Sequence, residues 1–536
     1  MVKGVARDLP AALTFWSLPL SLEDSLFQQR YEKIREIESL GFEAYPRKYE
    51  HTHTLAQVRA GYDATGAEEL EVEPPEVRVC GRLMTKRRQG KAGFCHLQKD
   101  GVQLQVYVRK DEVGDNDFEL YKKIDAGDLI GVEGILFRTK TGELTVRARK
   151  LEFLAKAVLS MPEKFHGLQD VELRYRQRYL DLITNPEVRK VFVKRNRLIS
   201  RLRRSLEERD YIEVETPMMQ PLYGGALARP FTTHHNALDI DLYLRIAPEL
   251  YLKRLVVGGL DRVYEINRNF RNEGVSTHHN PEFTMAEFYQ AYSDYRDLMG
   301  LSEELLREVA EATLDGETVS EYDGHKVDFG SLNRLTMKEA LCELWPHADP
   351  PKPEELDDVA RLRAMAQAHN AENENKIELS ETASAGECLM TLFEEICERR
   401  LVQPTLVYDY PVEASPLSKR KPEDPNWVER FEIYAGGMEI ANAYSELNDP
   451  QEQRRRFEAQ VEMRADGDAE AHGMDEDYVR ALCYGMPPTA GEGIGIDRLT
   501  MLLTGSRSIR DVILFPQMRP ESDIGVAARL AALEDG

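Results

Sequence analysis

The sequence of 536 residues lacks long apolar runs and paired cysteines. Its longest apolar candidate, residues 11–20, is well short of the roughly 18 residues that a membrane-spanning helix needs, and it contains Pro19. The segment also lacks the basic, cleavable layout of a signal peptide, so we expect a loose N-terminal extension and no membrane association. The six cysteines form no Cys-x-x-Cys pair, which disfavours a structural zinc site or a disulfide framework and favours a reducing, cytoplasmic location.

Positive charge is scarce overall but concentrated in one region. The chain has 70 Lys and Arg against 94 Asp and Glu, a net charge of −24, which disfavours a general nucleic-acid coat protein. Residues 77–150 are the exception, with 16 basic and 10 acidic side chains. They also show five short alternating strands with a helix-like segment before the fourth, the pattern of the small Greek-key barrel that binds oligonucleotides. We predict a basic barrel for single-stranded nucleic acid inside an acidic chain.

Residues 262–292 alternate as two strands around a polar loop, which predicts a long-loop antiparallel hairpin. Counting by twos gives each strand one polar and aromatic face: Glu265, Asn267, Asn269 and Arg271 on the first, and Phe283, Met285, Glu287 and Tyr289 on the second. Arginine suits phosphate, an aromatic ring suits base stacking, and a carboxylate suits an amine. The hairpin therefore predicts a site for a polyanionic ligand that carries an aromatic base.

Residues 431–447 predict a second hairpin, with Gly436-Gly437 as its two-residue turn. That turn places Tyr434 opposite Glu439, and it places Glu432 and Glu439 diagonally on one face of adjacent strands. Two such carboxylates repel unless a cation lies between them, a condition that Mg²⁺ bridging phosphates would satisfy.

Beyond this turn, Asn442, Tyr444 and Glu446 alternate on one face as an amide, an aromatic wall and a carboxylate, which suits an ammonium group. Simple alternation puts this trio on the face opposite Glu439. A bulge or bend is needed if all of them serve one site.

Two further segments carry weaker signals. Residues 491–498 (GEGIGIDR) do not have the spacing of a dinucleotide fingerprint, but their alternate glycines permit close backbone approach. Arg498 then lies near a helix start, where its guanidinium can stack on a base or hold a phosphate. Residues 188–209 predict a long basic helix that leads to a short strand ending at Thr216-Pro217.

Together, the four segments resemble class II aminoacyl-tRNA synthetases, over nearly the whole chain from about residue 22 to about residue 520. Residues 210–217 look like motif 1, residues 270–287 like motif 2 and residues 491–498 like motif 3. A barrel ahead of this core marks the subgroup that handles lysine, aspartate and asparagine. Within it, RIAPELYLKR at 245–254, FRNEG, HNPEFTM, NAYSELNDP and FHGLQD at 165–170 are similar to the lysyl-tRNA synthetase family. Ala443 departs from the glycine that many relatives have there, which leaves pocket detail open.

The resemblance implies an α+β chain with an N-terminal five-stranded OB-fold β-barrel and a class II catalytic domain built on an antiparallel sheet flanked by helices. The expected domains are an extension with a helix (1–76), the anticodon-binding barrel (77–155), a hinge (156–180), the catalytic domain (181–522, with a helical insert at about 297–400) and a tail (523–536). It also implies a homodimer formed through motif 1 around Pro217.

The resemblance further assigns site residues. Catalysis would rest on Arg271, Glu273 and Arg498. ATP would be bound by Arg271, Glu273, His279, Asn280, Phe283, Glu432, Glu439 and Arg498, with Phe283 and Arg498 sandwiching the adenine. Mg²⁺ would be carried by Glu432 and Glu439. Lysine would be bound by Gly225, Glu249, Glu287, Tyr289, Asn442, Tyr444 and Glu446. The anticodon would be read by Phe94, Gln105 and Glu143.

The implied activity is ATP-dependent formation of lysyl-adenylate and transfer of lysine to the 3′ end of tRNA(Lys), with Mg²⁺ as cofactor. Three alternatives remain. A synthetase for aspartate or asparagine would need a basic residue where Glu287 and Glu446 stand. A paralogue that lysylates a protein would lack the barrel. A catalytically inactive tRNA-binding protein would have lost Arg271, Glu432, Glu439 or Arg498, all of which are present.

Overall fold

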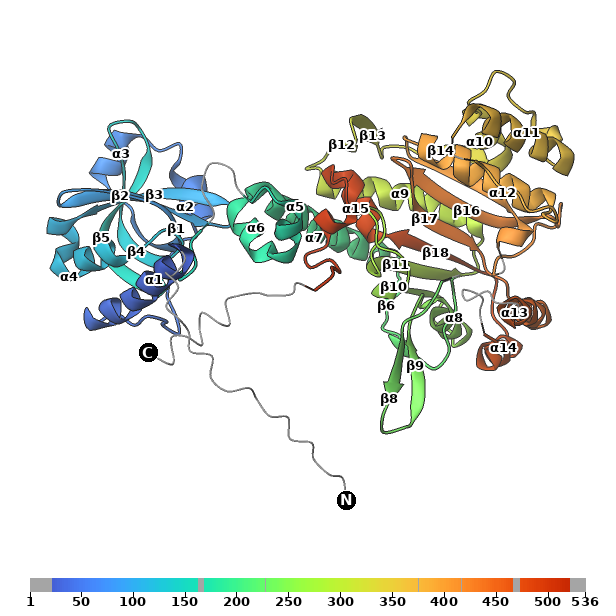
Figure 1. Ribbon diagram of the computed structural model, residues 1–536, viewed down its shortest axis with the longest axis horizontal. Helices are drawn as coiled ribbons and strands as arrows, with labels where there is room; N and C mark the ends of the chain where they lie inside the picture. Colours follow the sequence, from blue (N-terminus) through green and yellow to red (C-terminus); the bar gives the residue numbers. More distant parts are fainter. Residues whose placement is uncertain are drawn as a thin grey trace, which may run out of the picture. The chain divides into compact units, whose positions relative to one another are not determined.

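The structure is a computed structural model that describes residues 22–161, 168–226, 228–374, 376–415, 417–465 and 473–520. The predicted extension before residue 22, residues 165–167 of the FHGLQD segment and the tail from 523 lie outside the described residues. The chain divides into two compact units, residues 1–189 with 519–536, and residues 190–518 (Figure 1). No helix within the described ranges is both long and apolar enough to cross a membrane.

The first unit contains the predicted five-stranded barrel. It closes in the order β1-β2-β3-β5-β4, with β3 and β5 parallel and every other neighbouring pair antiparallel. Alternate apolar side chains such as Val79, Leu97 and Val106 fill its interior. The strands and the helix before the fourth strand are β1 (Glu76–Gln89), β2 (Ala92–Lys99), β3 (Val102–Arg109), α4 (Lys110–Lys123), β4 (Leu129–Arg138) and β5 (Leu144–Ala155). The predicted OB-fold is therefore confirmed.

Short helices flank the barrel in the sequence. Those before it are α1 (Leu22–Ser39), α2 (Leu55–Tyr62) and α3 (Ala67–Val72), and those after it are α5 (Val171–Arg176) and α6 (Arg178–Thr184). The long basic helix is α7 (Pro186–Glu207).

The second unit is organised around an eight-stranded sheet in the order β14-β15-β16-β17-β18-β11-β10-β6 (Figure 1). The two edge strands pair in parallel with their neighbours and the pairs between them are antiparallel, as the predicted fold class requires. The strands are β6 (Ile212–Glu213), β10 (Arg262–Phe270), β11 (Glu282–Ala291), β14 (Asn333–Thr336), β15 (Thr405–Pro411), β16 (Trp427–Ala435), β17 (Met438–Ser445) and β18 (Thr489–Gly495).

Helices pack on this sheet through apolar stripes. One core joins the sheet to α7, α9 (Tyr295–Thr313), α15 (Ile496–Thr504) and α16 (Ile509–Val512), and another joins it to α10 (Met337–Leu344), α11 (Val359–Glu372) and α12 (Ala385–Ile396). Helix α8 (Glu249–Val257) contacts α14 (Glu476–Cys483), which contacts α13 (Pro450–Ala465). The remaining elements are β7 (Met219–Gln220), β8 (Thr232–His235), β9 (Ile240–Leu244), β12 (Val319–Tyr322), β13 (His325–Asp328), η1 (Pro353–Glu355), η2 (Glu398–Arg400) and η3 (Val412–Ala414).

Residues 297–400, expected as a helical insert, include elements that pack on the main sheet or pair with its edge. Helix α9 contributes Leu298, Leu305 and Val309 to the main core, and β14 pairs with β15 at the sheet edge. Both relations depend on contacts between distant parts of the chain, which local periodicity does not reveal.

A β-bulge interrupts the β16–β17 hairpin. Ile433 pairs with Ala441, but the next residue, Tyr434, pairs with Glu439, so Ile440 has no residue opposite it. The register confirms that Tyr434 lies opposite Glu439. The extra residue, Ile440, is also the bulge that the sequence required. It brings Glu439 onto the same face as Asn442, which lies three residues further along the chain.

Glu492 of β18 is a buried carboxyl group on the apolar side of the sheet. It is flanked in register by the buried residues Phe288 and Ala443. Ser302 donates a hydrogen bond of 2.6 Å to Glu492 Oε2, whereas Oε1 is buried without a hydrogen-bond partner among the described residues. Burial in this apolar environment raises the pKa of Glu492 to about 8.

This raised pKa makes stability depend on pH. Between about pH 4.5 and about pH 8 the unfolded chain releases the Glu492 proton while the folded chain keeps it, so stability falls as pH rises through this window. We expect Glu492→Gln to remove this loss, which is worth up to a few kcal/mol at about 1.4 kcal/mol per pKa unit. Thermal unfolding of both proteins at several pH values checks this. An identical pH dependence in both would contradict it.

Candidate active site

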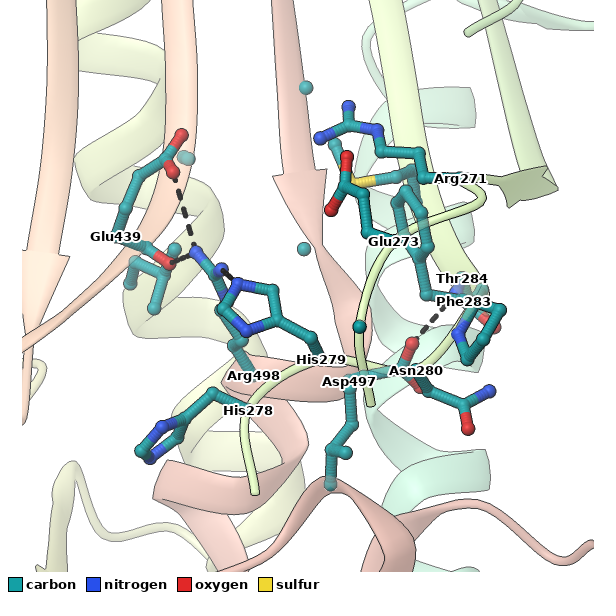
Figure 2. Close-up of a pocket in the computed structure, with 18 residues that line it drawn as sticks. Arg271, Glu273, His278, His279, Asn280, Phe283, Thr284, Glu439, Asp497 and Arg498 are labelled. Carbon is teal, nitrogen blue, oxygen red and sulfur yellow. Dashed lines mark hydrogen bonds and ion pairs between the residues drawn. The ribbon is translucent and has the colours of Figure 1, made fainter. Parts of the chain in front are cut away.

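A pocket of about 740 Å³ is formed where the β10–β11 hairpin meets β17, β18 and the start of α15. It contains seven of the eight residues predicted to bind ATP: Arg271, Glu273, His279, Asn280, Phe283, Glu439 and Arg498. Arg271, Glu273 and Phe283 lie on one side, and Arg498, Glu439 and His279 lie on the other (Figure 2). The predicted base-stacking partners Phe283 and Arg498 therefore belong to opposite sides of one cavity.

Arg271 links this pocket to a second one, because its side chain lines both. Its guanidinium carbon lies 5.1 Å from the centroid of the Phe283 ring, and its backbone N–H donates to the Pro281 carbonyl at 2.9 Å. Enclosure lowers the pKa of Arg271 from its ordinary value, although a guanidinium stays charged at neutral pH. A cation shared by two cavities is placed to contact a phosphate that joins their occupants.

Arg498 is held by two neighbours at the N-terminal end of α15. It donates to the Glu439 carbonyl at 2.7 Å and lies 3.3 Å from His279 Nε2. Burial, then the charge of Arg498, lowers the pKa of His279. The neutral ring can accept from Arg498 at Nε2 while Nδ1 donates to Ser276 Oγ at 2.9 Å. The Glu439 carboxylate adds an ion pair at 3.3 Å, so Glu439 and His279 together hold the guanidinium in the pocket.

Glu432 and Glu439 form the predicted carboxylate pair on adjacent strands. Glu432 is ion-paired with Arg430 and accepts hydrogen bonds from the hydroxyl groups of Tyr410 (2.9 Å) and Tyr434. Enclosure and the negative charge of Glu432 raise the pKa of Glu439. A cation between them would relieve this repulsion. Among the described residues no group of three or more His, Cys, Asp or Glu side chains could hold a metal, so phosphate and water oxygens would complete its coordination.

The second pocket, of about 1110 Å³, contains every residue predicted to bind lysine: Gly225, Glu249, Glu287, Tyr289, Asn442, Tyr444 and Glu446. Glu432 and Glu439 line it as well, as the bulge at Ile440 allows. The pocket therefore contains both a carboxylate pair that could bind a metal, Glu432 and Glu439, and a recess lined by acidic and aromatic side chains.

Buried carboxyl groups dominate this recess. Burial, then the charge of Glu249, raises the pKa of Glu287 to about 8, and Asn269 donates to Glu287 at 3.2 Å. The hydroxyl group of Tyr444 donates to Glu249 Oε1 at 2.8 Å. Such acidic side chains favour a cationic ligand group, because a nearby cation stabilises the ionised form of a buried carboxyl group.

Glycine at position 491 is required by this packing. A Cβ atom there would lie 2.3 Å from the Tyr289 ring and 2.4 Å from Glu446 Oε1. The alternate glycines of β18 thus allow side chains from β11 and Glu446 to lie directly over the strand.

Two cations at the site were missed by the sequence analysis. Arg430 lines the second pocket, ion-pairs with Glu432 and donates to Asn442 Oδ1 at 3.1 Å. It therefore contacts both the Glu432–Glu439 carboxylate pair and the amino-acid recess. Lys253 is buried between Glu249 and Glu446. Its i,i+4 spacing from Glu249 in α8 was a detectable signal, and Arg430 shares strand alternation with Glu432.

The barrel carries a third cavity that brings Phe94, Gln105 and Glu143 together. Gln105 Nε2 donates to Glu143 Oε2 at 3.1 Å, and the Phe94 and Tyr107 ring centroids lie 4.8 Å apart. Tyr107, His96 and Phe137 also line the cavity but were not predicted. Tyr107 lies two residues after Gln105 on β3, so alternation could have indicated it.

Pro217 follows β6 beside a buried polar cluster. The Thr216 hydroxyl donates to Glu265 Oε2 at 2.7 Å, and Arg245 is ion-paired with Glu265 at 2.7 Å. On either side of the proline, Ile212, Met218 and Met219 are about half exposed, so three large apolar side chains contribute to the surface near it.

Comparison with known proteins agrees with this geometry. Residues 170–519 match the family of tRNA synthetases class II (D, K and N), and residues 77–154 match the OB-fold nucleic acid binding domain. A lysine–tRNA ligase of Syntrophomonas wolfei is 51% identical over 494 residues, 92% of this chain and 97% of the relative. The enzymes of the same name from Halalkalibacterium halodurans and Bacillus subtilis are 52% and 51% identical, each over 93% of this chain and 98% of its own length. The chain therefore belongs to the class II tRNA synthetases of the D, K and N group and, within that group, to the lysine–tRNA ligase family.

Proposed function

We propose that this chain uses ATP to activate L-lysine as lysyl-adenylate and transfers the lysyl group to the 3′ end of tRNA(Lys) in the cytoplasm. One observation carries the proposal: Arg271 lines both a nucleotide-sized pocket with an aromatic and cationic wall and a recess walled by Glu249, Glu287 and Glu446. The names of relatives that are about half identical over nearly the whole chain support the same activity.

In this proposal the two pockets divide the substrates. ATP is bound by Arg271, Glu273, His279, Asn280, Phe283 and Arg498, with Glu432 and Glu439 at the boundary. Lysine is bound by Gly225, Glu249, Glu287, Tyr289, Asn442, Tyr444 and Glu446. The substrate's side-chain ammonium faces the acidic recess, and its carboxylate faces Arg271.

The chemistry follows from this placement. The lysine carboxylate is already a nucleophile, so it needs no general base to attack the α-phosphorus of ATP, and pyrophosphate leaves. Arg271 stabilises the charge that develops on the α-phosphate and orients it toward the carboxylate. Mg²⁺ held by Glu432 and Glu439 would neutralise phosphate charge. The 3′-hydroxyl of the tRNA then attacks the carbonyl carbon of the adenylate, and AMP leaves.

Amino-acid-dependent ATP–pyrophosphate exchange tests the proposal. We expect exchange with lysine, and none above background with aspartate, asparagine or arginine, because only a monocationic side chain of this length matches the recess. Chelation of Mg²⁺ should abolish it. Exchange with another amino acid would refute the lysine assignment, and no exchange by folded protein would favour a protein that only binds tRNA.

We infer that the barrel reads the anticodon. Phe94 offers a ring for base stacking, while Gln105 and Glu143 present an amide donor and a carboxylate acceptor side by side, which matches the carbonyl and N–H of uracil.

Phe94→Ala should weaken tRNA binding by about 1–3 kcal/mol, the usual worth of one stacked base. Titration of tRNA(Lys) measured by fluorescence anisotropy checks this. Tyr45→Ala is the matched control, since Tyr45 is an exposed aromatic residue of the same unit outside the cavity. Equal effects of the two substitutions would contradict the assignment.

We also infer a homodimer formed around Pro217, because Ile212, Met218 and Met219 expose apolar surface beside it. Met218→Glu/Met219→Glu should shift the protein from dimer to monomer in analytical ultracentrifugation, since it places two charges in an apolar interface. A wild-type monomer at micromolar concentration would refute this inference.

A further inference from the structure

Lys253 is a buried cation that pairs with two residues lining the amino-acid recess, Glu249 and Glu446. Its side chain, on α8, is fully buried. Its Nζ donates to Glu249 Oε1 at 2.5 Å and forms a second ion pair with Glu446 Oε2. It also lies 5.5 Å from the centroid of the Tyr444 ring. The protein's own ammonium group thus contacts two of the three carboxylates proposed to bind the substrate's ammonium group.

Lys253 engages one oxygen of each carboxylate and leaves the other. Glu446 Oε1 is buried without a hydrogen-bond partner among the described residues and lies over Gly491. Glu249 Oε2 lies over Gly225, 3.6 Å from the position that a Cβ atom would occupy there. Both glycines line the recess, so each of the two remaining oxygens lies beside a glycine of its lining.

The charges around Lys253 are unbalanced by one. Glu249 and Glu446 carry two negative charges when ionised, and Lys253 carries one positive charge, which leaves a place for one more cation. Burial alone would lower the pKa of Lys253, but Glu249 and Glu446 outweigh it and hold this pKa above its ordinary value. Burial holds the pKa of Glu446 well above its ordinary value; Lys253 opposes this rise and Glu249 adds to it. The ionisable groups around this cluster are Glu249 and Arg254 on α8, Glu287 and Tyr289 on β11, Tyr444 on β17, Glu446, Asp475, and Tyr478 on α14.

We propose that Lys253 is a positioning and specificity-determining residue, which pairs with one oxygen of each carboxylate, holds negative charge on the Glu249–Glu446 pair and turns the other oxygens toward the ammonium group of the bound lysine. The inference rests on the proposed function. It assigns Lys253 no contact with the substrate, since its amine faces the carboxylates. Without Lys253 the two carboxylates would lie close together with no counter-ion and would share a proton.

Steady-state ATP–pyrophosphate exchange with Lys253→Met tests the proposal. Methionine fills most of the volume of the lysine side chain but has no charge. We expect the KM for lysine to rise by about 10- to 100-fold, because removing one partner strands a buried charge, while the KM for ATP changes by less than about threefold. Lys338→Met is the matched control, because it removes a lysine that is paired at 2.7 Å with Asp357 and lines neither pocket.

The pH dependence separates this role from a merely structural one. In Lys253→Met the substrate must displace the shared proton, so the ratio of variant to wild-type KM for lysine should fall as pH rises from about 6 to about 8.5. Lys253→Arg keeps the charge and should show a ratio that does not depend on pH. A pH-independent ratio for Lys253→Met, or equal increases in the KM for lysine and for ATP, would overturn the proposal.

If Lys253→Met does not fold, the double variant Lys253→Met/Glu446→Gln supplies the test. It also removes the carboxylate of Glu446, which would otherwise be buried without its partner Lys253. The proposal expects a folded protein with a raised lysine KM whose ratio to wild type no longer changes with pH. A ratio that still falls with rising pH would overturn it. Failure of the wild-type protein to catalyse exchange with lysine would refute the proposed function. If the wild type is specific for lysine but the KM ratio of Lys253→Met to wild type does not change with pH, only this inference is refuted.

Discussion

The extra residue in β17 determines which side chains meet in the site. Strand alternation alone would point Glu439 away from Asn442, Tyr444 and Glu446. With Ile440 bulged out of register, Glu439 and these three residues line the same cavity as Glu432. A residue inserted into a ladder costs one pairing position, but it reorients every side chain beyond it. The Glu432–Glu439 pair therefore lies beside the amino-acid recess because of the single bulge at Ile440.

Buried cationic side chains stabilise the cluster of carboxylates in this pocket. Arg430 neutralises Glu432 and bonds to Asn442, and Lys253 lies between Glu249 and Glu446. Buried carboxylates without such partners would take up protons, as the raised pKa of Glu287 illustrates. The same physics acts on Glu492 across the sheet, where no cation among the described residues pairs with it and burial raises the pKa of the carboxyl group to about 8.

Much of the site could be predicted from the sequence, because the relevant residues lie at regular spacing within short segments. Alternation placed Asn269, Phe283 and Glu287 on adjacent strands, with Arg271 directly after the first strand, and the Gly436-Gly437 turn set Tyr434 opposite Glu439. The barrel followed from its five alternating strands. The position of the bulge could not be predicted, since the apolar pattern around Ile440 fits either register. Lys253 and Arg430 were missed because their partners lie on other elements, so their roles depend on tertiary contacts.

The central claim is that buried negative charge in the recess selects the side-chain ammonium of lysine. Calorimetric titration of the full-length protein with L-lysine and with L-norleucine, which keeps the aliphatic chain but lacks the ammonium group, tests it most directly. The account predicts that norleucine binds at least about 100-fold more weakly, because it leaves the oxygens of Glu249 and Glu446 buried and unpaired. Comparable affinities for the two amino acids would contradict it.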